Sequence, residues 1–122
     1  MSRTCYTLTI NPDGSAERGQ HTTDGGDFDL KTMQDLVGGY IEGVPCDTGR
    51  DGLTIFADED GIPKQLPVNY LGTLVARALN DEYGTPIKLC LLGPVVACST
   101  SKEDIDFFAD KVAIAQMYLV AR

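Results

Sequence analysis

The sequence is short of positive charge. Its 122 residues carry 10 Lys and Arg against 18 Asp and Glu, a formal net charge of -8. A chain of this charge repels phosphates, so we expect no direct binding to nucleic acid or to an anionic membrane surface. The charge fits a protein in solution, or one that binds a basic surface of another protein.

Other features that the sequence lacks exclude further classes of protein. The four cysteines form no Cys-x-x-Cys pair, which argues against a zinc ribbon or a thioredoxin-like motif. No apolar run approaches the ~20 residues of a membrane helix, and the first ten residues lack the apolar segment of a signal peptide. We therefore expect a cytoplasmic protein, in the host cell if a phage encodes it, whose reduced cysteines are small core residues. We expect no metal and no cofactor.

The spacing of apolar residues predicts a single α+β domain over residues 1–122. Alternation favours strands over residues 4–10 and 53–57, and the segments 15–23 and 40–45 are expected to be a polar edge strand and a further strand. Residues 87–99 are the most apolar segment and are interpreted as a buried strand with a kink at Gly93 and Pro94. Apolar residues three and four apart favour three helices, with Asp29 and Asn69 as N-caps of the first two and a capping box of Thr100 with Glu103 at the start of the third. Few strand–helix–strand repeats occur, so we expect a mostly antiparallel sheet covered by about three helices on one side.

One tripeptide raises a catalytic hypothesis. Asp47, Thr48 and Gly49 spell the active-site motif of aspartic proteases, in which two carboxylates share one proton. Here Pro45 stands where that fold needs a paired strand, and the residues that follow are typical of a turn. The predicted helices also exceed what an all-β fold holds. We therefore interpret the tripeptide as part of a hairpin loop.

Several residues are instead candidates for binding. Tyr40 and Tyr70 lie near the ends of predicted elements, where tyrosine often anchors contacts. Phe107 follows Asp104 on the last helix and cannot face the same side as its neighbour Phe108. We expect it to point sideways or outward together with Ile114 and, in one version, Tyr118, and to form a flank on which a second subunit could dock. The acids Asp104, Asp106 and Asp110 supply the charge for an electrostatic contact.

Residues 36–99 resemble a known family. The segments "LVGGYIEGVP", "LTIFADEDGIPKQLPVN" and "LLGPVVACS" are similar in order and spacing to the landmarks of the domain-of-unknown-function family numbered 3846. The matching residues are Leu36, Val37, Gly38, Gly39, Tyr40, Ile41, Glu42, Asp58, Glu59, Gly61, Leu66, Pro67, Asn69, Gly93, Val95 and Val96. On this resemblance residues 36–99 form the family-like core, and the first 25 residues and the last helix lie outside it.

The resemblance implies a phage or mobile-element origin and an accessory role, and it supplies no catalytic residue. Our leading hypothesis is a non-enzymatic protein that acts by binding a host or phage protein. Its role would be counter-defence or host takeover. One form of this hypothesis has the protein acting as a homodimer. One alternative is a ligand sponge or small hydrolase with a site around Glu42, Asp47 and Asn69. Another is a DNA mimic, which requires the carboxylates to line one face.

Overall fold

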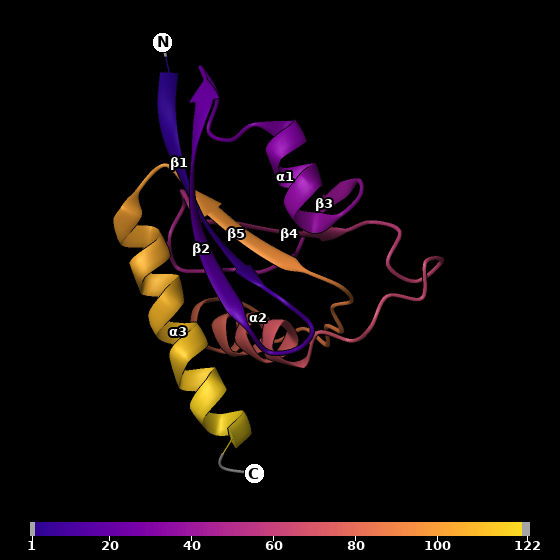
Figure 1. Ribbon diagram of the computed structural model, residues 1–122. Coiled ribbons are helices and arrows are strands. Elements are labelled where there is room, and N and C mark those ends of the chain that lie inside the picture. The colour runs from indigo at the N-terminus through magenta and orange to yellow at the C-terminus, as the bar shows by residue number, and fades with distance from the viewer. Residues whose placement is uncertain (1, 121–122) are drawn as a thin grey trace.

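A five-stranded sheet forms the centre of the structure, which describes residues 2–120 and side chains as far as residue 119. This computed structural model has strands β1 (Ser2–Ile10), β2 (Ala16–Asp24), β3 (Ile41–Gly43), β4 (Thr54–Asp58) and β5 (Val95–Ser99). The helices are α1 (Leu30–Val37), α2 (Tyr70–Tyr83) and α3 (Lys102–Val120). The strands lie in the order β2-β1-β5-β4-β3, and all neighbours pair antiparallel (Figure 1). The predicted α+β class and antiparallel sheet are confirmed.

The first and last strands of the chain, β1 and β5, lie side by side in the interior of the sheet. β1 pairs with β2 on one side and with β5 on the other, so the N-terminal hairpin is part of the main sheet. The hairpin closes through a turn in which Gly14 has a φ of 89°. Its N–H bonds to the carbonyl of Asn11. That backbone conformation favours glycine, which explains why the turn ends on this residue.

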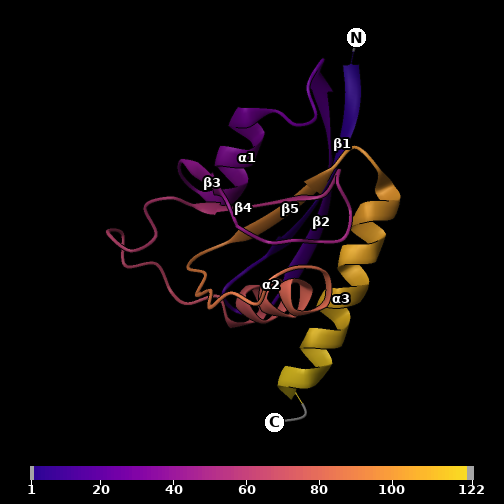
Figure 2. The same ribbon diagram turned by 180° about the vertical axis from the view of Figure 1, so that it is seen from behind.

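The helices cover both faces of the sheet, and the expectation that they lie on one side was wrong. In both views α1 lies on the opposite side of the sheet from α3 (Figures 1 and 2). The reason is in β5, where Val95 and Ala97 point to the face covered by α2 and α3 while Val96 and Cys98 point to the α1 face. A strand buried on both faces reads as one continuous apolar run, so alternation could not reveal the second layer.

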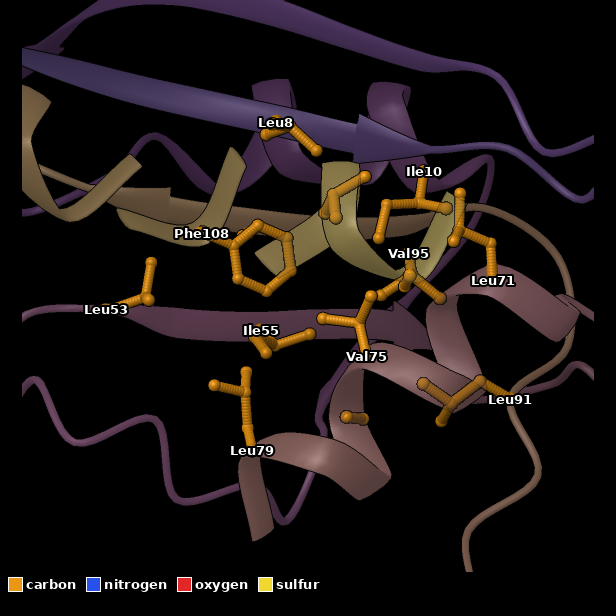
Figure 3. Close-up of a cluster of buried hydrophobic side chains, with 14 of the residues drawn as sticks. Leu8, Ile10, Leu53, Ile55, Leu71, Val75, Leu79, Leu91, Val95 and Phe108 are labelled. Carbon is orange, nitrogen blue, oxygen red and sulfur yellow. The ribbon is translucent and has the colours of Figure 1, made fainter. Parts of the chain in front are cut away.

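The larger core lies between the sheet and the pair α2 and α3. Figure 3 shows Phe108 of α3, Ile55 of β4 and Val75 of α2 pointing toward one another. All three are at least nine-tenths buried. Truncating such a side chain to alanine lowers the free energy of unfolding by about 2–5 kcal/mol, so packing on this face contributes much of the stability of the fold.

The smaller core lies beneath α1. Met33 and Val37 of the helix pack on Cys5, Phe56 and Cys98 of the sheet. Cys5 and Cys98 are therefore core residues, as expected, but Cys90 is exposed in the loop before β5 and Cys46 is half-buried. The expectation that all four cysteines belong to the core was wrong for Cys90.

The predicted helix starts are mostly confirmed. Asp29 accepts a hydrogen bond from the N–H of Thr32 and caps α1, and Asn69 caps α2 in the same way through Gly72. α3 begins at Lys102, so Thr100 is not its N-cap. β5 is shorter than the predicted strand because Gly93, at a φ of 72°, turns the chain just before it.

The Asp-Thr-Gly tripeptide lies in the β3–β4 loop, and each residue has a structural role there. The backbone N–H of Asp47 donates to Asn80 Oδ1 at 2.8 Å. Thr48 Oγ1 accepts from the N–H of Arg50 at 3.1 Å and closes a local turn. Gly49 has a φ of 77°, and a Cβ there would lie 2.6 Å from the ring of Tyr83. The predicted hairpin loop is confirmed.

Two glycine substitutions separate backbone strain from crowding. Gly14→Ala adds a Cβ at positive φ with nothing within 4 Å, whereas Gly49→Ala at a similar φ meets Tyr83. We expect Gly14→Ala to lower the free energy of unfolding by about 1 kcal/mol, from strain alone. Gly49→Ala should lower it by about 2–4 kcal/mol, because overpacking is added to the strain. Urea denaturation measures both, and equal losses would show that the contact with Tyr83 is unimportant.

Candidate functional site

Asn69, a candidate binding residue, is fully enclosed, with 0% of its surface exposed. Its Nδ2 donates to the carbonyls of Ile10 at 2.9 Å and Gly93 at 2.8 Å, and its Oδ1 accepts from the N–H of Gly72 at 2.8 Å. These bonds use both donors and one lone pair of the amide. Asn69 therefore joins β1, the approach to β5 and the start of α2.

The residues of the alternative enzymatic site do not converge. Glu42 is exposed on β3 and lines a hollow of about 190 Å³ together with Ile62 and Cys90. Asp47 lines a separate hollow of about 440 Å³ beside Tyr83. The Asn69 amide is buried and occupied by its hydrogen bonds to the backbone. Glu42, Asp47 and Asn69 therefore share no described pocket.

A third hollow, of about 510 Å³, lies beside the Gly38-Gly39-Tyr40 turn. Tyr40 is 66% exposed on its wall, and Lys64 reaches in from the β4–α2 loop. Lys64 Nζ lies 2.7 Å from Asp58 Oδ2, and the side chain of Asp58 is only 1% exposed. A Cβ on Gly39 would lie 2.7 Å from that oxygen, so the ion pair requires glycine there. This pairing was not predicted, because Lys64 lies in an irregular loop.

The environment of Asp58 sets its charge. Burial alone would raise the pKa of Asp58, but the bonds from Lys64 and from the N–H of Asp60 outweigh it and hold that pKa below the ordinary value. The pKa of Lys64 is raised by the same bond to Asp58. The carboxylate therefore stays ionised, and it ties the β4–α2 loop to the sheet.

Phe107 and Asp104 are held in contacts with the β3–β4 loop. The guanidinium of Arg50 lies 4.5 Å above the centre of the Phe107 ring and also pairs with Asp104 at 3.2 Å. Asp104 accepts a further bond from Ser99 at 2.7 Å. The ring of Tyr83 packs beside Phe107 with 6.0 Å between centres. Phe107 is therefore only partly exposed, and the open part of the flank expected there lies further along α3.

That open surface is a groove between α2 and α3 with a largely apolar lining. We define the α2–α3 groove by its lining residues, which are Leu74, Val75, Ala78, Glu82, Lys111, Ile114, Ala115 and Tyr118. Its cavity volume is about 280 Å³. Ile114 and Tyr118 are 60% and 70% exposed, and the adjacent Met117 is 72% exposed. The C-terminal end of α3 extends past α2 (Figures 1 and 2).

Some of the residues that form this groove could be predicted from the sequence. Ile114, Met117 and Tyr118 are spaced by three and four, as one helical face requires, but the core face of α3 uses different positions. Ile114 and Tyr118 were expected beside Phe107, and Met117 and Leu74 were missed. Tyr70, the first residue of α2, is 69% exposed but does not line the groove.

Within residues 2–120, no three His, Cys, Asp or Glu side chains are grouped as a metal site requires. The one histidine, His21, lies on β2 with its Nε2 3.2 Å from Thr7 Oγ1. None of the described helices combines the length and the apolar character needed to cross a membrane.

Comparison with known proteins identifies the family. Residues 5–118 match the family described as domain of unknown function DUF3846. The chain belongs to this family. No curated protein and no solved structure gives a significant match. The family match extends well beyond residues 36–99, so the expectation that the N-terminal hairpin and the last helix lie outside it was wrong.

Asn69→Ala tests the buried amide. It leaves the carbonyls of Ile10 and Gly93 and the N–H of Gly72 without their partner. We expect a loss of about 2–4 kcal/mol in the free energy of unfolding, measured in urea. Gln34→Ala, which truncates a half-buried amide on α1, serves as the control and should cost under about 0.5 kcal/mol. Similar losses for the two variants would contradict the role given to Asn69.

Asp58→Asn tests the buried ion pair through its pH dependence. A lowered pKa in the folded state stabilises the fold above the ordinary value of about 3.9, and that contribution is lost as the pH falls through the lowered value. The variant should therefore be less stable than the wild type at neutral pH. The difference should shrink below about pH 3.9, as Asp58 itself becomes neutral. A difference that stays constant across this range would contradict the account.

Proposed function

We propose that this protein is a non-catalytic accessory factor that binds another protein through the α2–α3 groove. The observation that carries the proposal is the exposure of Ile114, Met117 and Tyr118, each at least 60% exposed on one helical face. Clustered apolar side chains of this kind mark interaction sites more often than single exposed ones. Fully burying such a side chain contributes about 1.5–3 kcal/mol, so three of them can anchor a partner.

Charge indicates the kind of partner. The chain carries a net charge of -8, and Asp81 and Asp110 are exposed next to the groove residues Glu82 and Lys111. Glu82 and Lys111 pair at 2.9 Å and neutralise each other at one end of the groove. The net charge and these two exposed carboxylates, which adjoin groove residues in sequence, favour acidic surroundings for the groove. This supports a partner surface with an apolar centre and a basic rim.

The setting of that partner follows from the family resemblance. The resemblance implies a phage or mobile-element origin, so we propose a host or phage protein as the partner, with counter-defence or host takeover as the role. The two alternatives have less support. The residues of the proposed hydrolase or sponge site lie apart, and many carboxylates that a DNA mimic would display are held in ion pairs, among them Asp58, Asp104 and Asp106.

A matched pair of double variants tests the groove. Ile114→Asp with Met117→Asp adds two charges at the groove, and Leu30→Asp with Ile62→Asp adds two at other exposed apolar positions. Each protein is used to capture partners from host lysate, and the main captured protein is then purified for titration. We expect the groove variant to bind at least about tenfold more weakly, because charge replaces apolar contact.

The control variant should bind like the wild type, and binding should weaken at high salt. Equal weakening of both variants would indicate a general charge effect and not a groove contact. Unchanged binding by the groove variant would contradict the proposal. Circular dichroism of both variants checks that the fold is kept.

A further inference from the structure

Strand β2 forms one outer edge of the sheet. It pairs with β1 along its whole length, from Ala16 opposite Ile10 to Asp24 opposite Ser2, and has no other neighbour among the described strands. Nine residues make it as long as any strand of the fold. Ala16, Arg18, Gln20, Thr22 and Asp24 are all exposed. The edge therefore presents a row of backbone groups to solvent.

The hairpin turn shows which backbone groups these are. The N–H of Asn11 donates to the carbonyl of Ser15 at 2.8 Å, which makes this a hydrogen-bonded pair. Such pairs alternate along an antiparallel ladder, so the next ones are Thr9 with Glu17 and Thr7 with Gly19. The odd-numbered residues of β2 bond to β1. The even-numbered residues, with Gln20 at the centre, direct their N–H and C=O groups outward.

The opposite edge of the sheet, strand β3, has features that prevent pairing with another strand, and β2 lacks them. β3 has only three residues, and Pro45 follows it closely. A short strand and a nearby proline are common means of preventing edge-to-edge pairing, as are lysines and bulges. The β2 sequence AERGQHTTD contains no proline and no lysine, and its register with β1 has no bulge. The side chain of Arg18 bonds to Asp106 of α3 at 2.6 Å.

We infer that β2 binds the β2 strand of a second copy of this chain, antiparallel and across a two-fold axis at Gln20, so that two sheets join into one. In this full-length register Arg18 lies opposite Thr22 of the second copy, and Glu17 lies opposite its Thr23. No like charges oppose each other in this register, so the strand can pair with itself without charge repulsion. This surface is separate from the α2–α3 groove, so either proposal can fail alone.

Gln20→Pro tests the pairing, with Gln20→Ala as its matched control. Because the N–H of Gln20 points outward, proline there removes no bond to β1, and edge strands tolerate it. Light scattering after size exclusion should show the wild-type mass rising with concentration from 13.2 kDa toward twice that value. Gln20→Ala keeps the N–H and should do the same. Gln20→Pro should remain at the monomer mass.

Amide hydrogen exchange by NMR on the wild-type chain gives an independent test that needs no variant. In dilute protein the amides of Gly19 and His21 should be protected, and those of Arg18, Gln20 and Thr22 should exchange freely. At high concentration the second group should slow at least about tenfold, as its N–H groups become paired. A monomer at every concentration, or a dimer that Gln20→Pro leaves intact, would overturn the inference. So would a dimer in which the three outward amides stay unprotected.

Discussion

The arrangement of the chain depends on the buried side-chain amide of Asn69. This amide bonds to the end of β1 at Ile10, to Gly93 just before β5 and to the first turn of α2 at Gly72. The backbone N–H of Asn69 also donates to Leu91 at 2.8 Å. These segments are far apart in sequence, and the carbonyls that the amide satisfies are buried. A buried carbonyl without a partner is costly, so few other residues could occupy this position.

Three glycines on which the family resemblance rests have structural roles as well. Gly38 ends α1 at a φ of 91°, Gly39 leaves space for the Asp58–Lys64 pair, and Gly93 turns the chain against Leu66. The pattern shared with the family thus specifies a fold. The two surfaces that we propose for binding, the α2–α3 groove and the β2 edge, lie largely outside those residues. A family fold can therefore present different contacts in different members.

Local features of this fold could be predicted from the sequence, and long-range ones could not. Asp29, Asn69 and Gly38 mark helix ends through short-range chemistry, and the alternation in β1 identified a strand. The covering of both sheet faces was missed because β5 is apolar on both sides. The ion pair of Asp58 with Lys64 was missed because an irregular loop carries the lysine. The exposure of Met117 depends on how α3 packs against the rest of the fold, which periodicity along one helix cannot show.

The most direct test of this account is the exchange rate of the Asn69 side-chain amide protons, measured by NMR. Both protons are bonded to buried backbone carbonyls, so we predict that they exchange as slowly as the backbone amides at the centre of β1 and β5. The exposed side-chain amide of Gln20 provides the fast reference within the same molecule. If the Asn69 protons exchanged as fast as those of Gln20, the amide would be open to solvent, and the fold could not depend on it in the way described.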